Sequence, residues 1–387
     1  MTDDSTAVLA HLRGMSGEMV DLLSRLVDIE SPSGEPPRQV PVRAVLVDEL
    51  EPLGYAVELV DAPEYGDHLV ARPTGPAEDR PSQLLIGHMD TVWPLGTAVD
   101  RPATVDGANL TGPGSFDMKA GLVQMLYALR SLRDLGLEPP ADPVVFVNTD
   151  EEIGSPHSRR RLELLAAGAS RAFVLEGSYG AAGLLKVGRK GVGRYVIRAF
   201  GAAAHAGLEP GEGASAVLEI SHQIQKLFEL NDVERGVTVN VGTVDGGMRP
   251  NVIAAEASAH IDVRVFTAED GERVDAAIRA LEPVNDGVRL EVEGGFDRPP
   301  MERNQANEDL WRQASSIGEE LGLDLDAAVV GGASDGNLTS QFVPTLDGLG
   351  AVGGGAHRVD EHVAIESMPE RAALVALLLM APLGGGI

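Results

Sequence analysis

The sequence of 387 residues contains no cysteine, few aromatic residues and no long uninterrupted apolar segment. The absence of cysteine excludes disulfides, thiol catalysis and zinc sites with thiolate ligands, and it is typical of proteins in a reducing compartment. The longest apolar run, residues 372–383, contains Pro382 and is too short to cross a bilayer. Acidic Asp3 and Asp4 stand where a secretory signal needs basic residues. We therefore expect a cytoplasmic protein with no membrane partner.

Basic residues are also scarce. The 31 Lys and Arg residues face 59 Asp and Glu residues, which gives a net charge of -28. Such a charge opposes non-specific binding to nucleic acid, so we expect no nucleic-acid partner. Apolar residues make up 43% of the chain, as in ordinary globular proteins, and the length favours two domains.

The first half of the sequence alternates helical and strand patterns. Helical periodicity or helix-start residues predict helices over residues 5–28, 38–53, 118–134 and 157–167. Short apolar runs predict strands at 55–60, 67–72, 83–88, 143–149 and 171–176. This alternation predicts an α/β fold whose sheet is covered by helices on both faces.

The pattern changes after about residue 188. Six elements follow in the order strand, helix, strand, strand, helix, strand, which is the ferredoxin-like α+β arrangement. The α/β pattern then resumes with a helix at 304–321, a strand at 343–347 and a helix at 367–381. We therefore predict a catalytic domain formed by residues 1–188 and 299–387, with an inserted domain at 189–298.

Histidine and carboxylate residues stand where apolar runs end and glycine-rich turns begin. They are His88, Asp90, Asp117, Glu151, Glu152, Glu176 and His357. Imidazole and carboxylate without thiolate are typical ligands of zinc or a similar divalent ion in a catalytic site. His88, Glu151 and Glu176 each follow a predicted strand, and ligands of such sheets collect beyond the carboxyl ends of the strands. The sequence thus predicts a metal-dependent hydrolase.

Each of these signals is weak when it stands alone. An isolated Asp-Glu-Glu run is usually a solvated turn, and a single histidine after a strand is more often structural. The joint occurrence of several ligand types favours a site. His362 is the alternative to His357, but the glycine run 353–355 favours His357 as the residue on a tight active-site loop.

Eight motifs occur in a characteristic order: HMDTVWP, GSFDMKAG, DEEIGS, LEG, GAAAHAG, RPNVIA, GGASDGN and GGGAH. In this order they resemble the dinuclear zinc metallopeptidases that include glutamate carboxypeptidase, acetylornithine deacetylase and aminoacylase, most closely the glutamate carboxypeptidase branch. The resemblance covers nearly the whole chain. It implies a zinc-exopeptidase-like mixed sheet, in which the inserted domain serves as a lid and dimerisation domain.

The resemblance also implies roles for the ligand residues. Asp117 would bridge two zinc ions per subunit, with His88 and Glu176 completing one site and Glu152 and His357 the other; cobalt and manganese are the alternative metals. Asp90 would fix the tautomer of His88. Glu151 would be the general base.

Further residues are implied by the same resemblance. His205 would reach the active site of a partner subunit and stabilise the oxyanion, which implies a homodimer; Ala204 stands before it where relatives often have serine, so a supporting hydrogen bond is expected to be absent. The implied substrate-binding residues are Asn251, Arg264, Arg298, Gly332, Ser334 and Asn337. Arginine binds a carboxylate through two parallel hydrogen bonds, although Arg298 could equally form a surface ion pair.

The predicted activity is hydrolysis of the amide bond of a C-terminal or N-acylated amino acid with a free carboxylate, in a small peptide or N-acyl amino acid. An N-acyl-amino-acid deacylase similar to acetylornithine deacetylase is the alternative. A catalytically silent binding protein would be expected to lack the base or a ligand, and all are present. The segment GRKGVGRY lacks the glycine spacing of a dinucleotide site.

Overall fold

A computed structural model describes residues 3–75 and 80–383. The chain divides by compactness into two units: residues 189–302 and 331–333 form the second unit, and the other described residues form the first. Each unit has its own apolar core.

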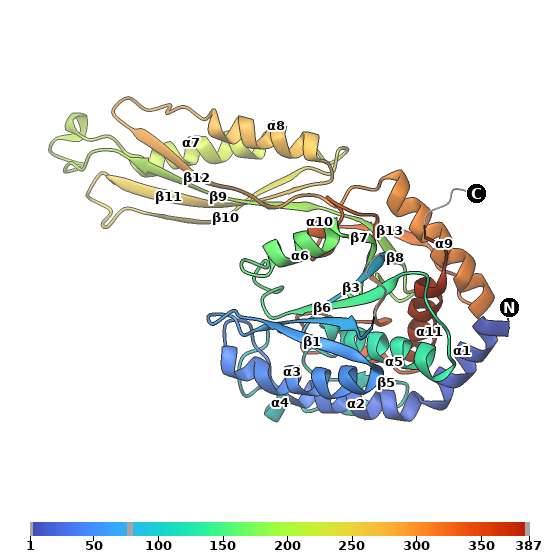
Figure 1. The fold of residues 1–387 in the computed structure, drawn as a ribbon. Helices are drawn as coiled ribbons and strands as arrows, with labels where there is room; N and C mark the ends of the chain where they lie inside the picture. Colours follow the sequence, from blue (N-terminus) through green and yellow to red (C-terminus); the bar gives the residue numbers. More distant parts are fainter. Residues whose placement is uncertain (1–2, 76–79, 384–387) are drawn as a thin grey trace. The chain divides into compact units, whose positions relative to one another are not determined.

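The first unit contains a six-stranded mixed sheet (Figure 1). In spatial order its strands are β1 (Tyr55–Val60), β2 (His68–Pro73), β6 (Asp142–Asn148), β3 (Ser82–His88), β7 (Ala169–Val174) and β14 (Thr345–Leu346). From β6 to β14 neighbouring strands run parallel, whereas β1 and β2 pair antiparallel. Parallel strands are buried on both faces, which explains why they occur in the sequence as continuous apolar runs.

Helices cover both faces of this sheet. In β6, Val145 and Val147 join one apolar core and Val144 and Phe146 the other, because successive side chains point to opposite faces. The larger core includes α1 (Asp3–Gly14), α2 (Ser16–Asp28), α3 (Pro36–Leu50), α5 (Ala120–Asp134), α9 (Gln305–Leu321) and α11 (Ser367–Met380), and the smaller one includes α6 (Arg159–Ala167) and α10 (Gly336–Thr339). From Met368 to Leu379 every residue of α11 except Glu370 is buried. The predicted α/β class is confirmed.

The N-terminal helical pattern forms two helices. The single helix predicted over residues 5–28 was wrong, because the chain turns at Met15 between α1 and α2. Gly14 and Gly17 flank this turn. Each glycine disfavours a helix interior by about 1 kcal/mol relative to alanine, which explains the break.

Several short elements had no periodic signal in the sequence. One small antiparallel sheet consists of β15 (Gly353–Gly354), β16 (His362–Ala364), β5 (Asn109–Thr111) and β4 (Thr104–Asp106). A separate pair joins β8 (Leu185–Arg189) to β13 (Ala327–Val330). The remaining single turns are η1 (Glu51–Leu53), α4 (Thr97–Asp100), η2 (Ser115–Lys119) and η3 (Pro210–Glu212). The small sheet positions the site, since it joins the segment before Asp117 to the segment around His357.

The second unit contains a four-stranded antiparallel sheet with two helices on one face (Figure 1). The strands, in spatial order, are β10 (Thr238–Gly246), β11 (Glu256–Val265), β9 (Gly191–Phe200) and β12 (Arg289–Arg298), and the helices are α7 (Ala216–Phe228) and α8 (Ala268–Arg279). Ile197 and Ile261 of the sheet share a core with Ile220 and Ile278 of the helices. The chain order and the sheet order confirm the predicted ferredoxin-like arrangement.

Among residues 3–75 and 80–383, no helix combines the length and apolar character needed to cross a membrane.

Candidate metal centre

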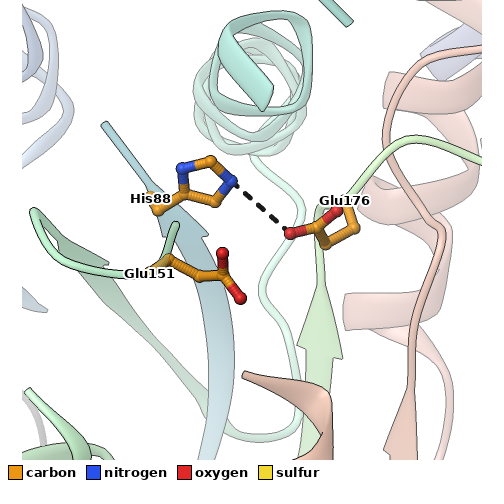
Figure 2. A group of neighbouring side chains, drawn as sticks. All are labelled: His88, Glu151 and Glu176. Atoms are coloured by element: carbon orange, nitrogen blue, oxygen red, sulfur yellow. Dashed lines mark ion pairs between the residues drawn. The ribbon is translucent and has the colours of Figure 1, made fainter. Parts of the chain in front are cut away.

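Three predicted site residues meet at one edge of the first unit's sheet. His88 is the last residue of β3, Glu151 lies in the turn after β6, and Glu176 follows β7 by two residues. These three strands are parallel, so their carboxyl ends lie at the same edge. Figure 2 shows the three side chains directed toward one another, with His88 Nε2 3.5 Å from Glu176 Oε1. One ligand atom from each lies within 4.8 Å of the others.

Two further residues reach this group from loops. Asp117, in the η2 turn before α5, places Oδ1 3.2 Å from His88 Nε2 and Oδ2 3.3 Å from His357 Nε2. His357 Nε2 also lies 3.1 Å from Glu152 Oε2. The backbone of His357 is left-handed, with φ of 61°. Such a conformation is uncommon for a residue other than glycine, and strained residues of this kind cluster at active sites.

His362, the alternative to His357, is not in this group. It lies in β16, and its Nδ1 is 2.9 Å from the carbonyl oxygen of Asp360. The structure therefore brings together His88, Asp117, Glu152, Glu176 and His357, with Glu151 beside them.

The residues of this group shift one another's pKa values. Burial and the nearby carboxylate of Asp117 raise the pKa of Glu152 to about 7. Hydrogen bonds to Asp117 and Glu152 raise the pKa of His357 to about 10. Burial lowers the pKa of His88, but hydrogen bonds to Asp117, Asp90 and Glu176 outweigh it and raise that pKa well above its usual range. Burial acts to raise the pKa of Asp117, and the hydrogen bonds from both histidines lower it.

A divalent cation fits this set of residues. Glu152 Oε1 is buried and has no hydrogen-bond partner within the described part of the chain. Several carboxylates and two imidazoles with no thiolate are hard and borderline ligands, which suit zinc, manganese or cobalt. The raised pKa values of His88 and His357 reflect the same property, because the carboxylates stabilise positive charge placed among them.

Asp90 contacts both His88 and the turn after β6. The carbonyl oxygen of Asp90 lies 2.9 Å from His88 Nδ1, and its carboxylate oxygen Oδ1 lies 3.5 Å from the same atom. A carbonyl can only accept, so in the neutral ring Nδ1 holds the proton and Nε2 presents its lone pair to the centre. The Asp90 carboxylate also accepts from the amides of Glu151 and Glu152, each at 3.2 Å, and from the Ser33 hydroxyl at 2.6 Å. It therefore holds the turn on which these two glutamates lie.

The sequence did not reveal Glu361 as a site residue. Its carboxylate accepts hydrogen bonds from the backbone amides of Gly114, Phe116 and Asp117 and from the Trp93 indole. No local signal marks Glu361, because its donors lie more than 240 residues away in the chain.

In the second unit, His205 and Asn251 lie on adjoining loops. The Ala206 amide donates to the Asn251 carbonyl at 3.1 Å, and His205 pairs with Val252. The exposed His205 ring accepts at Nδ1 from the amides of Gly207 and Leu208, both at 3.1 Å. Ala204 cannot supply a side-chain hydrogen bond, and the backbone amides of Gly207 and Leu208 support the ring instead. Because Nδ1 accepts, the neutral ring holds its proton on Nε2, which can act as a hydrogen-bond donor.

Arg264 and Arg298 occupy matching positions in the second unit. Both are paired in register with Val192 of the central strand β9, one from β11 and one from β12. Residues opposite each other in antiparallel strands share a face, so the two arginines lie on one face, separated by two strand spacings of roughly 10 Å in total. Arg264 binds both carboxylate oxygens of Asp262, at 2.8 and 3.0 Å. Arg298 is buried, with 4% of its surface exposed.

The GGASDGN loop has buried side chains where substrate contacts were predicted. Ser334 donates to Asp347 at 2.6 Å, and the Asn337 side chain accepts from the Ser334 amide at 2.9 Å. Both residues are fully buried, so a substrate contact by these side chains stays a prediction. Gly332, in the second unit, is exposed, and a Cβ atom there would meet nothing within 4 Å.

Comparisons with solved structures of known proteins support the fold. Among solved structures, aminopeptidase PepT from Bacillus cereus ATCC 10987 is similar with a TM-score of 0.79 and 22% identity, over 94% of this chain and 98% of that one. The Bacillus subtilis YXEP protein, described as a dinuclear metal binding peptidase from the M20 family, has a TM-score of 0.70 and 17% identity, over 95% and 98%. These likenesses concern the fold.

Sequence comparisons identify the family of the chain. Carboxypeptidase G2 from Pseudomonas sp. (strain RS-16) is 29% identical over 381 residues, which cover 95% of this chain and 90% of that protein. The family model of peptidase family M20/M25/M40 matches residues 84–381. The chain therefore belongs to peptidase family M20/M25/M40, whose members are hydrolases that act on peptide bonds.

Proposed function

We propose that this hydrolase cleaves the amide bond of a C-terminal or N-acylated amino acid with a free carboxylate, as a glutamate carboxypeptidase does, with two zinc ions per subunit. The observation that supports it most strongly is Asp117, whose two carboxylate oxygens each face a different histidine. The likeness to carboxypeptidase G2 over 95% of the chain favours a carboxypeptidase.

The centre would hold its ions through residues already in contact. Asp117 would be shared, His88 and Glu176 would bind one ion, and Glu152 and His357 would bind the other. Bound divalent cations would polarise the scissile carbonyl and lower the pKa of a water molecule.

Glu151 is the proposed general base. It takes a proton from the attacking water and delivers it to the leaving nitrogen. Its backbone amide is fixed by Asp90, so the turn that holds the base is also the turn that holds Glu152. One buried carboxylate therefore orients both glutamates.

The substrate carboxylate is proposed to bind the arginines of the second unit. Arg264 already holds the carboxylate of Asp262 with two hydrogen bonds, which is the geometry that a substrate carboxylate would use. Asp262 would have to release Arg264 or share it. Arg298 shares the face of Arg264 and adds a second cation.

The second unit is proposed as a lid and dimerisation domain, with His205 of each subunit serving the site of the other. An Nε2 donor suits stabilisation of an oxyanion. The strand β10 is at the edge of its sheet, and Val244 on β10 and Val217 on α7 are exposed apolar residues near that edge. Edge strands tend to pair with another copy unless they are protected. A cytoplasmic location stays a prediction from the sequence.

The test is metal analysis of the purified protein followed by a substrate panel. Two zinc equivalents per chain and release of glutamate from acyl-glutamates and C-terminal glutamyl dipeptides are expected. Release of ornithine from N-acetylornithine without glutamate release would favour the deacylase alternative. A metal-loaded protein that hydrolyses neither class would overturn the proposal.

A further inference from the structure

Glu361 is a buried carboxylate on which hydrogen-bond donors from two distant loops converge. Oε2 accepts from the Gly114 amide and the Trp93 indole, both at 2.9 Å. Oε1 accepts from the amides of Phe116 at 2.9 Å and Asp117 at 3.0 Å. The residue is 1% exposed. Successive backbone amides that converge in this way form an anion-binding concavity, here filled by a side chain of the protein itself.

The segments that meet at Glu361 are those of the metal centre. Asp117 donates its own amide to the carboxylate, and Glu361 follows His357 by four residues. Trp93 lies on the loop that follows His88. Three of the five proposed ligands therefore lie on segments joined through one carboxylate.

A second contact joins two of the same segments. The Arg101 guanidinium lies 4.2 Å from the centroid of the Trp93 ring, and it donates to the Val359 carbonyl at 3.2 Å. Trp93 is therefore held on one side by a cation and at its N–H by Glu361. The loop after β3 cannot move away from the His357 loop without breaking the hydrogen bonds from Trp93 to Glu361 and from Arg101 to Val359.

We propose that Glu361 is a positioning residue of the metal centre: it sets the position of Asp117 relative to His88 and His357 without itself binding metal or substrate. This inference rests on the proposed function, because it takes those three residues as ligands. A carboxylate suits the role because all four of its partners are donors. An amide in its place has one oxygen, and its NH2 group would face N–H groups that it cannot bind.

The first test is Glu361→Gln, with Glu219→Gln as a matched control. Glu219 is a fully buried carboxylate of α7 that also accepts from several donors, namely the amides of Val284 and Asn285 and the side chains of Asn285 and Gln223. Both substitutions remove a buried charge from a similar set of donors. The donors to Glu219 named above all belong to the second unit, whereas the proposed ligands belong to the first, so the Glu219 variant reports the general cost to folding.

The measurements are zinc affinity by competition with a chelator, the absorption spectrum of the cobalt-substituted protein, and kcat and KM separately. For Glu361→Gln we expect a fall of about 10- to 100-fold in zinc affinity, the range typical for groups that orient ligands. The cobalt spectrum should shift, and kcat should fall while KM is unchanged. Glu219→Gln should melt at a lower temperature but keep the wild-type zinc affinity and cobalt spectrum.

Wild-type zinc affinity and an unaltered cobalt spectrum in folded Glu361→Gln would overturn the inference, as would an equal loss of affinity in Glu219→Gln. If Glu361→Gln does not fold, Glu361→Asp is tested in its place. This variant keeps the negative charge but has a side chain shorter by one methylene. An unchanged zinc affinity of Glu361→Asp would count against the inference. A wild-type protein that binds no divalent cation defeats the proposed function as well. If the wild-type protein binds two zinc ions and the Glu361 variants have the same zinc affinity as the wild type, only this inference is defeated.

Discussion

Asp90→Asn should loosen the turn that positions both Glu151 and Glu152. The carboxylate is fully buried, and its two oxygens together accept from two backbone amides at 3.2 Å and a hydroxyl at 2.6 Å. Asparagine offers one oxygen, so at least one amide faces an NH2 group. A buried unpaired donor costs about 1–3 kcal/mol, and the remaining bonds lose the gain from a charged acceptor. We expect the free energy of unfolding of the metal-free protein to fall by about 3 kcal/mol.

Asp150→Asn is the matched control, one residue before the same turn. Asp150 accepts from the amides of His157 and Ser158 through Oδ2, and its buried Oδ1 has no hydrogen-bond partner among residues 3–75 and 80–383. The single oxygen of asparagine can take over both bonds, so we expect a loss of only about 1 kcal/mol.

The assay combines urea denaturation of both variants with amide hydrogen exchange of a peptide covering residues 149–156. Local exchange is needed because a chain with two compact units need not unfold in one step. Asp90→Asn should show faster exchange at residues 151 and 152 and a kcat reduced by about 10- to 100-fold. Equal losses of stability in the two variants, or unchanged exchange in Asp90→Asn, would refute the reasoning.

Three further predictions follow from the site. Glu151→Gln should retain its metal yet lose about 10²- to 10⁴-fold in kcat, the usual contribution of a general base; metal analysis beside kinetics checks this, and full activity in the loaded variant would contradict it. Mixed dimers of His205→Ala with Glu151→Gln should recover part of the activity if each site uses His205 of the partner subunit, and well-mixed dimers without recovery would argue against shared sites. A cation binds only the neutral ring of His357, and the pKa of this ring is raised to about 10. Zinc binding should therefore release protons, and zinc affinity should increase as the pH rises toward 10. In the metal-free protein, the stability that the protonated ring contributes is complete below the ordinary pKa of 6.5 and is lost as the pH rises through 10. Calorimetry in two buffers measures the proton release, and melting temperatures across pH measure the stability; zinc binding without proton release would contradict this prediction.

Some of the site followed from local signals in the sequence. His88 and Glu176 stand at the ends of apolar runs, and parallel strands place such ends at one edge. The ferredoxin-like order of the second unit followed from periodicity alone. These features were predictable because one short segment determines each of them.

Other features depend on partners far away in the sequence. Glu361 looks like an ordinary acidic residue until the chain folds and brings Gly114, Phe116 and Asp117 to it. The second contact of Asp90 is hidden for a related reason, since the spacing of His88 and Asp90 cannot show that the carboxylate also accepts from the amides of another loop.

The position of α11 has a consequence for synthesis on the ribosome. This helix is almost entirely buried, and it comes near the C-terminal end of the described chain, so the larger core of the first unit stays open to solvent until residue 380 has emerged. Residues 189–302 are contiguous and include a complete core, so the second unit can fold while the first still waits for its final helix. During that interval the apolar faces of α1 and α5 are exposed, and this is the stage at which a chaperone would be needed.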